Sequence, residues 1–209
     1  MKILFLTNNE ITYPLMQWLE ENGNDINLFS ERLTADYLKN INPDLVISYN
    51  YKYIIEKNLI DYMNGKIVNL HTSYLPYNRG RHPNIWSFID DTPKGITIHF
   101  IDPLLDKGRI IARKQLNIKD SETLRSSYEI LHNEIQELFK EIFLNIENWE
   151  NISFIPHEKG SYHSLKDFNT IKHLIADWDM KMNDLVILYK NNLEITNEGK
   201  FIKFIKIKE

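Results

Sequence analysis

The chain has 209 residues, of which 43% are hydrophobic and 12% aromatic, so it carries enough apolar side chains to bury a sizeable core. Its formal net charge of −4 comes from 29 acidic and 25 basic residues, and this balance argues against a broadly basic surface for nucleic acid or an anionic membrane. The absence of cysteine excludes disulfides and Cys-ligated zinc.

The N-terminal apolar run gives way to Asn8-Asn9-Glu10 after only a few residues. No signal peptide is apparent, and no run approaches the roughly 20 apolar residues needed to cross a bilayer. We therefore expect a cytoplasmic protein with no membrane partner and no nucleic-acid partner.

The first 150 residues alternate between strand-like and helix-like patterns. Short apolar runs predict strands at 2–7, 26–29, 45–48, 95–100 and 110–116, and a further strand that begins at residue 66. Helical spacing predicts helices at 14–22, 33–41, 58–63 and 83–88, and a long one capped by Asp120 or Ser121 that ends at Ile146. This order predicts an α/β fold, a Rossmann-like, mostly parallel sheet with helices on both faces.

The stretch from Lys66 to Arg109 holds the candidate chemistry. Asn69 and His71 lie two positions apart after a short apolar run, so their side chains point from the same face of a strand end. Asp106 follows the next predicted strand in a polar loop, where it could meet them. The amide can stabilise an oxyanion, the imidazole can accept a proton and the carboxylate can orient it, which suits acyl transfer to an amine without a covalent nucleophile.

Several segments in this stretch resemble the folate-dependent formyltransferase family. They are Asn69-x-His71, Ser73-x-Leu75-Pro76, Arg79-Gly80, the run Gly95 to Phe100, and Leu105-Asp106-x-Gly108. The resemblance implies that Asn69, His71 and Asp106 are catalytic and that N10-formyltetrahydrofolate donates the formyl group. It covers roughly residues 1–150, taken as the catalytic domain, and leaves 151–209 as a C-terminal tail for substrate binding and dimerisation.

The resemblance also implies a folate pocket beside the catalytic trio. Its expected members are Tyr51, Lys52, Tyr53, Ile54, Leu70, Asp102, Leu104 and Leu105. The three tyrosines at positions 49, 51 and 53 could instead simply cover the edge of the sheet.

The expected acceptor is a nucleotide-linked amino sugar. Arg79 and Arg81 flank a glycine in a loop beside the Asn-x-His strand and could meet its diphosphate, although exposed arginines are usually solvated. The full set of expected substrate contacts is Asn8, Asn9, Ser73, Tyr77, Asn78, Arg79, Gly80, Arg81 and Tyr162.

A metal site is a weaker alternative for the same histidines. His71, His82 and His99 with Asp106 could form a metal-binding set, but no tight ligand spacing supports one and the resembled family needs no metal. We therefore expect no metal, and we expect His99 to pack under the active site as a hydrogen-bonding neighbour.

Within the family, the turn Gly160 to His163 and the segment from Ser48 to Lys57 look most like the sugar N-formyltransferases. This resemblance implies an acceptor amino group on a nucleotide-linked, commonly dTDP-linked, 3- or 4-amino sugar bound for surface polysaccharide of the O-antigen type. The turn after the first strand holds no glycine, unlike the phosphate loop of glycinamide ribonucleotide formyltransferases, which remain the alternative. Too few residues follow position 150 for the tRNA-binding domain of methionyl-tRNA formyltransferases. A non-catalytic nucleotide-sugar binding module would not need the trio.

The tail carries one clear late signal. Strand-like residues at 193–196 and 200–207 flank Asn197-Glu198-Gly199, a pattern that predicts a hairpin. Its apolar side chains are too many for one buried face, so we expect the hairpin to contribute to a homodimer.

Overall fold

A computed structural model of the chain describes the backbone of residues 1–205 and the side chains of residues 1–193. The strands of the main sheet are β1 (Lys2–Leu6), β2 (Asp25–Phe29), β3 (Leu45–Tyr49), β4 (Ile67–His71), β6 (Gly95–Phe100) and β7 (Ile110–Gln115), and β5 (Arg79–Gly80) pairs with β8 (Tyr162–His163). The α-helices are α1 (Tyr13–Glu21), α2 (Ala35–Ile41), α3 (Lys57–Tyr62), α4 (Pro83–Ile89), α5 (Leu124–Phe143), α6 (Trp149–Ile152), α7 (Leu165–Ile171) and α8 (Met182–Ile205). Short 3-10 turns lie at Glu10–Thr12, Ile146–Asn148 and Lys172–Leu174.

The six main strands form one sheet in the order β2-β1-β3-β4-β6-β7. The pairs among β2, β1, β3 and β4 are parallel, whereas β6 runs antiparallel to both β4 and β7. The predicted mostly parallel sheet is therefore confirmed. Because β6 is reversed, its C-terminal end lies beside the N-terminal end of β4, at the opposite end of the strands from where β1, β3 and β4 finish.

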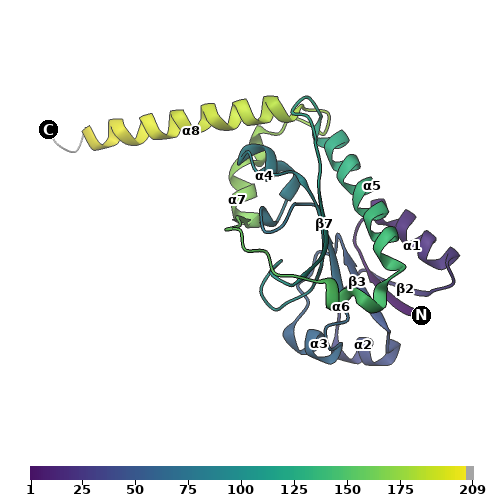
Figure 1. The fold of residues 1–209 in the computed structure, drawn as a ribbon. Coiled ribbons are helices and arrows are strands. Elements are labelled where there is room, and N and C mark those ends of the chain that lie inside the picture. The colour runs from purple at the N-terminus through teal and green to yellow at the C-terminus, as the bar shows by residue number, and fades with distance from the viewer. Residues whose placement is uncertain (206–209) are drawn as a thin grey trace.

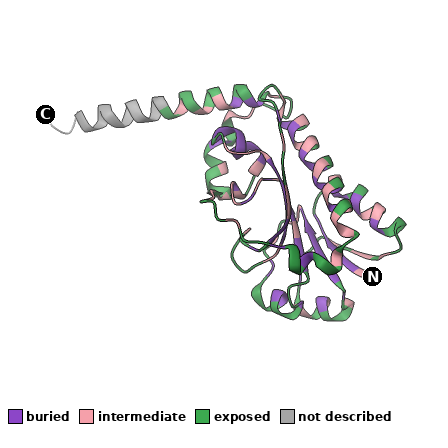
Figure 2. Cartoon of the chain, viewed as in Figure 1, coloured by how far each residue is buried: buried purple, intermediate pink, exposed green. Residues whose placement is uncertain are grey.

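Helices cover both faces of the sheet, as predicted (Figure 1). On one face, α1, α4 and α5 pack with Phe5, Ile47 and Leu70 in the larger hydrophobic core. On the other face, α2 and α3 pack with Leu6, Val46 and other residues in a smaller core. Figure 2 shows that the buried residues concentrate along the strands between these helical layers.

The long helix α5 begins later than the sequence predicted. Its N-cap is Thr123 rather than Asp120 or Ser121: Thr123 Oγ1 accepts from the Ser126 N–H at 3.0 Å, and Ser126 Oγ accepts from the Thr123 N–H at 2.9 Å. This reciprocal pair satisfies two backbone donors that a helix start would otherwise leave unpaired.

The predicted C-terminal hairpin is wrong, because α8 runs continuously from Met182 to Ile205. The helix is anchored at its start, where Met182 and Leu185 are fully buried in the larger core. Extending an anchored helix forms one hydrogen bond for each residue ordered, and a single interior glycine such as Gly199 costs only about 1 kcal/mol. Residues 206–209, which include the last two positions of the expected second strand, lie outside the described residues.

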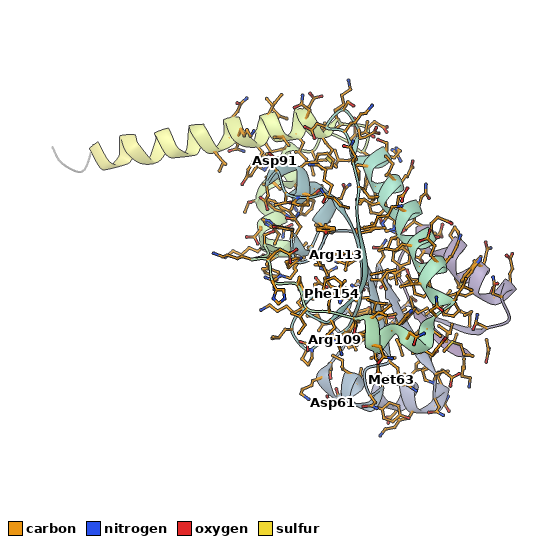
Figure 3. All side chains as sticks on the ribbon, in the orientation of Figure 1. Asp61, Met63, Asp91, Arg109, Arg113 and Phe154 are labelled. Carbon is orange, nitrogen blue, oxygen red and sulfur yellow. The ribbon has the colours of Figure 1, made fainter. Side chains whose placement is uncertain are left out.

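Residues after α6 extend the sheet at its β7 edge. Ile110 and Phe154 exchange backbone hydrogen bonds of 2.8 and 2.9 Å, and the Arg109 guanidinium donates to the Ser153 carbonyl at 2.8 Å. Figure 3 shows Arg109, Arg113 and Phe154 along this edge, where the Arg113 guanidinium lies 5.4 Å from the Phe154 ring centre. The chain then continues to β8, which pairs with β5 in a separate two-stranded sheet.

None of the helices described for residues 1–205 is both long enough and apolar enough to cross a membrane.

Candidate active site

Asn69 and His71 project from β4 on the same side of the sheet, two residues apart on a regular strand. The antiparallel register places Asn69 opposite His99 of β6 and His71 opposite Thr97. Asn69 is half-buried, while the His71 and His99 side chains are almost fully buried. Two imidazoles and an amide therefore gather in a largely dry environment at the middle of the β4–β6 pair.

Asp106 reaches this cluster from a loop that folds back over the sheet. The loop leaves β6 beside the N-terminal end of β4, so Asp106 does not come from a strand that ends next to His71. Its carboxylate oxygens lie 3.9 Å from His71 Nε2 and 3.8 Å from His99 Nε2. Asp106 has a left-handed backbone φ of 51°, a conformation that aspartate tolerates better than most residues. The turn is tight, because a side chain at Gly108 would collide with the Phe100 carbonyl.

Gly80 holds the Asp106 carboxylate from the opposite side. The Gly80 N–H donates to Asp106 Oδ2 at 2.8 Å. Gly80 has φ +94°, and any Cβ at this position would meet the His163 carbonyl of the paired strand β8. Only glycine therefore fits here without displacing either β8 or the carboxylate.

Burial opposes ionisation of Asp106, yet His71, His99, the Gly80 N–H and the Arg79 charge together lower the pKa of its carboxyl below the ordinary value. For His99, burial lowers the pKa of the imidazole despite the nearby carboxylate. At neutral pH the site thus contains an ionised Asp106 and a neutral His99.

The tautomer of His99 follows from its partners. His99 Nδ1 donates to the Phe100 carbonyl at 2.7 Å, which leaves Nε2 without a proton. That nitrogen accepts from Asn69 Nδ2 at 3.2 Å. One N–H of the Asn69 amide is therefore used to fix its orientation, and the other remains available to a reacting group. This is the supporting position expected for His99.

The two loops predicted to hold folate present apolar side chains to solvent. The exposed fractions are 72% for Ile54, 59% for Leu104 and 46% for Leu105. Asp102 Oδ1 accepts from the Leu104 N–H at 2.8 Å and so shapes the second loop. Both loops are anchored on the smaller core, through Ile55 in the first and Ile101 in the second.

The remaining members of the predicted folate set serve mainly to fix the first loop or the sheet. The Tyr51 hydroxyl donates to the Glu31 carbonyl, and the Lys52 N–H donates to Asn8 Oδ1 at 2.9 Å. The Lys52 ammonium lies 4.8 Å from the centre of the Tyr53 ring. Leu70 is buried in the larger core and is not available to a ligand.

Two predicted substrate contacts, Ser73 and Asn78, are buried and fully engaged within the protein. Ser73 Oγ donates to the Tyr77 carbonyl at 2.9 Å. Asn78 bonds with both Thr92 and Ser161 through its side chain, at 2.6 and 3.1 Å. These hydrogen bonds shape the 72–82 loop. The Asn78 carbonyl lies 3.3 Å from His71 Nε2, so this loop also borders the imidazole.

The two predicted arginines differ in their surroundings. Arg79 Nε donates to the Ser161 carbonyl at 3.2 Å, and Arg79 lines a cavity of about 230 Å³ together with Asp106 and Lys107. Arg81 is more exposed and donates to the Lys52 carbonyl at 2.9 Å. Tyr162, which pairs with Arg79 in the β5–β8 ladder, is half-exposed.

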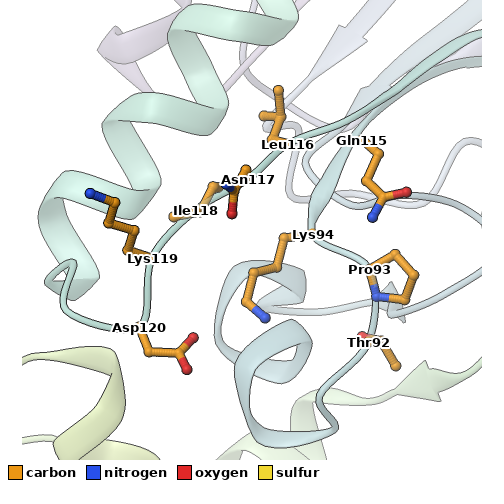
Figure 4. Close-up of a pocket in the computed structure, with 9 residues that line it drawn as sticks. All are labelled: Thr92, Pro93, Lys94, Gln115, Leu116, Asn117, Ile118, Lys119 and Asp120. Carbon is orange, nitrogen blue, oxygen red and sulfur yellow. The ribbon is translucent and has the colours of Figure 1, made fainter.

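A second hollow, of about 440 Å³, lies between loops 92–94 and 115–120 (Figure 4). Its lining includes Lys94, Lys119 and Asp120 but none of the predicted catalytic residues. Among the residues whose side chains the structure describes, no group of three or more histidines or carboxylates could hold a metal ion. His82 stacks on Phe168, with 3.6 Å between the ring centres.

Beyond the ends of β1 and β3 lies a polar cluster of which sequence reasoning named Asn9 but missed Asn50, Tyr128 and His132. Asn9 Nδ2 and Asn50 Nδ2 both donate to the Tyr128 hydroxyl, at 3.0 and 2.9 Å. Beneath them, the Tyr49 hydroxyl lies 2.6 Å from Nδ1 of the fully buried His132. The available signal was the four-residue spacing of Tyr128 and His132, which puts both polar side chains on the inner face of α5.

Asn69, His71 and Asp106 bring an amide, an imidazole and a carboxylate together on one face of an α/β sheet. These are the groups that an acyl-transferring enzyme needs when its acceptor is an amine. A family model described as formyl transferase matches residues 6–143, and the chain belongs to this family of formyl-transferring enzymes.

The chain is 31% identical, over 186 residues, to the dTDP-4-amino-4,6-dideoxyglucose formyltransferase of Mycobacterium tuberculosis, covering 83% of this chain and 79% of that protein. It is 29% identical to the methionyl-tRNA formyltransferase of Clostridium tetani, but spans only 52% of its length. The crystal structure of the formyltransferase PseJ from Anoxybacillus kamchatkensis, in complex with UDP-4,6-dideoxy-4-formamido-L-AltNAc and tetrahydrofolate, superposes with a TM-score of 0.81. It is 36% identical, covering 88% of this chain and 97% of that one.

Proposed function

We propose that this enzyme transfers a formyl group from N10-formyltetrahydrofolate to the amino group of a nucleotide-linked 3- or 4-amino-dideoxy sugar. The meeting of Asn69, His71 and Asp106 on one face of the sheet carries the proposal. The likeness to PseJ, solved with a formamido sugar nucleotide and tetrahydrofolate, supports both the donor and the class of acceptor. The mycobacterial relative named for a dTDP-linked amino sugar supports dTDP as the carrier.

In the proposed reaction, the amine nitrogen attacks the formyl carbon and the carbonyl oxygen becomes an oxyanion. The free N–H of Asn69 donates to that oxyanion, and the His99 contact keeps the amide in position to do so. His71 takes up the proton lost by the amine. The resulting imidazolium faces two oxygens through Nε2, the Asn78 carbonyl at 3.3 Å and Asp106 Oδ2 at 3.9 Å, and both stabilise its positive charge.

Collapse of the tetrahedral intermediate breaks the bond between the formyl carbon and N10 of the folate. N10 then takes a proton, and the products are tetrahydrofolate and the formamido sugar. Asp106 is ionised and lies between the two imidazoles, so it can return the proton from His71, directly or through a bound water.

The folate is proposed to lie against the loops at Tyr51–Ile54 and at Asp102–Leu105. Exposed Ile54, Leu104 and Leu105 offer apolar cover for a pterin ring, and Lys52 and Tyr53 lie at the rim. The backbone groups of these loops supply hydrogen-bond donors and acceptors at the same place.

The diphosphate of the acceptor is proposed to meet Arg79. Arg79 and Lys107 bring two cations to the wall of one cavity, and the catalytic carboxylate Asp106 lines the same cavity. An anion there would lie close enough to the trio to place a sugar amine beside His71. Arg81, bonded to the Lys52 carbonyl, has the smaller part, and Tyr77 and Tyr162 border the loop and strand that carry Arg79.

The runner-up is the phosphoribosylglycinamide formyltransferase of purine synthesis. That acceptor requires a phosphate-binding turn, and residues 8–12 contain no glycine. The side chain of Asn8 is committed to Ser30 and Lys52, at 2.7 and 2.9 Å. A sugar-binding module without catalysis would leave the Asn69, His71 and Asp106 arrangement without a use.

In the cell, we propose that the formamido sugar is made in the cytoplasm for surface polysaccharide of the O-antigen or lipopolysaccharide type. We also propose a homodimer formed through the C-terminal segment. Support comes from α8, which extends away from the body of the protein beyond its contact with α4 (Figure 1). Ile187, Leu188 and Leu193 on its described part have exposed fractions of 47%, 42% and 45%, an apolar surface of the kind that a second copy would cover.

Incubation with N10-formyltetrahydrofolate and a panel of dTDP- and UDP-linked 3-amino and 4-amino sugars tests the function. The expected result is a product heavier by one formyl group, detected by mass spectrometry, together with release of tetrahydrofolate. Formylation of glycinamide ribonucleotide in place of every amino sugar would overturn the assignment.

A further inference from the structure

Asn9, Asn50, Tyr128 and Trp178, here called the amide–tyrosine cluster, lie outside the catalytic trio and the arginine loop. We propose that this cluster binds a neutral hydrogen-bonding substituent, a hydroxyl or an acylamino group, on the ring of the acceptor sugar. The inference rests on the proposed function and concerns which amino sugars the enzyme accepts.

The position of Asn50 connects the cluster to the reaction. Tyr49 pairs with Leu70 in the β3–β4 ladder, so Asn50 and His71 each follow by one residue at the ends of two neighbouring parallel strands, and the Asn50 amide turns towards Tyr128 of α5. Neighbouring strands are about 4.8 Å apart. A six-membered sugar ring whose amine reaches His71 is wide enough to bring another substituent to Asn50. Ligands of open α/β sheets bind at this edge.

The hydrogen bonds of the cluster leave two groups ready for a ligand. The Tyr128 hydroxyl already accepts from Asn9 and Asn50, and none of the described residues accepts its own hydrogen. Asn50 Oδ1 likewise has no partner among the described residues, whereas Asn9 Oδ1 is occupied by the Ile11 N–H at 3.1 Å. One donor and one acceptor side by side match a hydroxyl or an acylamino group, since each of these can both donate and accept.

The cluster is poorly suited to a phosphate. Within the described part of the chain, no lysine or arginine side chain bonds with Asn9, Asn50 or Tyr128, and charge-assisted donors are what phosphate sites use. Nearby Arg125 is neutralised by its 2.8 Å ion pair with Asp179. The neutral amide–phenol pair therefore differs from the cavity lined by Arg79, Lys107, Asp106 and Glu158, where charged groups gather.

Trp178 adds an aromatic face at the rim. Its ring lies edge to face with Tyr128, 5.6 Å between centres, and its exposed fraction is 52%. The Trp178 carbonyl accepts from the Arg125 N–H at 2.9 Å, which fixes this segment on the start of α5. An exposed, anchored tryptophan next to neutral polar groups can cover the apolar side of a sugar ring.

The support beneath the cluster is rigid and uncharged. Burial lowers the pKa of His132 to about 3, so the ring stays neutral, and it stacks on Tyr49 at 5.3 Å between centres. The centre of the His132 ring lies 4.2 Å from the centre of the Tyr128 ring, and His132 Nε2 lies 3.5 Å from Asn50 Nδ2. His132 thus acts as a positioning residue that holds Asn50 and Tyr128 in place without adding charge.

The test compares acceptors that differ in one ring substituent. Wild type and Tyr128→Phe are assayed with dTDP-4-amino-4,6-dideoxyglucose, its 2-deoxy and 3-deoxy analogues, and a UDP-linked 4-amino sugar that carries a 2-acetamido group. Wild type should lose roughly 5- to 100-fold in kcat/KM when the recognised substituent is missing, because a polar group of the cluster that the bound sugar covers is then left unpaired. Tyr128→Phe should reduce this preference to within a few-fold while leaving the folate KM unchanged.

Two further variants keep the result decisive. Asn50→Gly removes the amide but suits the left-handed φ of 53° at this position, so the backbone should stay in place while the preference falls. Tyr62→Phe, an exposed tyrosine on α3, is the matched control and should behave as wild type. Unaltered substituent preference in both Tyr128→Phe and Asn50→Gly would overturn the proposed subsite. Absence of turnover by wild type on every amino sugar would instead defeat the proposed function itself.

Discussion

Asn69 and His99 face each other across the β4–β6 pair, with Nδ2 of the amide 3.2 Å from Nε2 of the imidazole. Because His99 Nδ1 donates to the Phe100 carbonyl, the direction of this bond is fixed from amide to ring. His99, which takes no proton in the proposed reaction, thereby determines where the Asn69 N–H points.

Loss of the His99 ring should therefore lower kcat more than it changes KM. We expect His99→Phe to reduce kcat by roughly 10- to 100-fold with both KM values nearly constant, because Asn69 loses its orientation but the binding surfaces remain. His99→Gln, whose amide oxygen can accept from Asn69, should recover part of the rate. Steady-state kinetics check this, and equal activity of both variants with wild type would show that Asn69 needs no such support.

Substitution within the catalytic trio should be far more damaging. Asn69→Ala, His71→Asn and Asp106→Asn should each cut turnover by about 100-fold or more, because each removes an oxyanion donor, the proton acceptor or its carboxylate partner. Circular dichroism should report an unchanged fold. Near-normal turnover by Asp106→Asn would remove Asp106 from the chemistry.

Arg79→Ala should raise the KM for the nucleotide sugar by roughly 10-fold or more while the KM for the folate stays nearly constant, since only the acceptor carries a diphosphate. Arg81→Ala is the matched comparison from the same loop and should have the smaller effect, because that guanidinium is bonded to the Lys52 carbonyl. An equal rise in both KM values for Arg79→Ala would indicate a structural role through Ser161 instead.

Folding stability should fall as the pH drops below about 6.5. His132 has a folded-state pKa of about 3, and the pKa of His99 is also lowered. Below 6.5 the unfolded chain binds protons at these positions and the folded chain does not, so each histidine costs roughly 1.4 kcal/mol per pH unit until its folded pKa is reached. Asp106, whose pKa is lowered too, adds a loss of the same sign at more acidic pH.

Denaturant unfolding between pH 7 and pH 4 measures this slope. His132→Gln should flatten it, whereas His157→Gln, at an exposed position, serves as the surface control. If the free energy of unfolding changes with pH equally in His132→Gln and in wild type, protonation of His132 does not contribute to the loss of stability in acid.

Truncation after Lys190 tests the proposed homodimer. The shortened chain keeps the buried start of α8, including Leu185, and should remain folded. We expect light scattering to report a dimer for the full chain and a monomer for the truncated one. A dimer that survives truncation would place the interface elsewhere.

Local patterns in the sequence predicted most of the sheet and the position of Asn69 and His71 on a strand. Asn69-x-His71 lies on a strand, and the alternation that puts both side chains on one face is a local property of that strand. Asp106 was grouped with them by assuming that its loop left the same edge of the sheet. In the structure β6 is antiparallel, and Asp106 reaches the site only because its loop folds back, which no local pattern reveals.

Two other features depended on contacts between distant parts of the chain. The strand-like residues after position 192 form the end of a helix whose start is fixed by core packing at Met182 and Leu185. Tyr128 fits the apolar stripe of α5, a pattern that by itself indicates core, whereas the asparagines that bond to it come from two separate turns. Helical periodicity identifies an inward face, but it does not distinguish core from a polar pocket on that face.

The pairing of Gly80 with His163 has a consequence for how the enzyme is made. Residues 1–110 emerge from the ribosome with β4 and Asp106 complete, but without the partner strand that holds Gly80 against the carboxylate. The site can therefore be finished only when residues 162–163 have been synthesised and have folded back onto the 72–82 loop. A nascent chain that stalls before that point would carry Asn69, His71 and Asp106 without the strand pairing that supports the Gly80 hydrogen bond to Asp106.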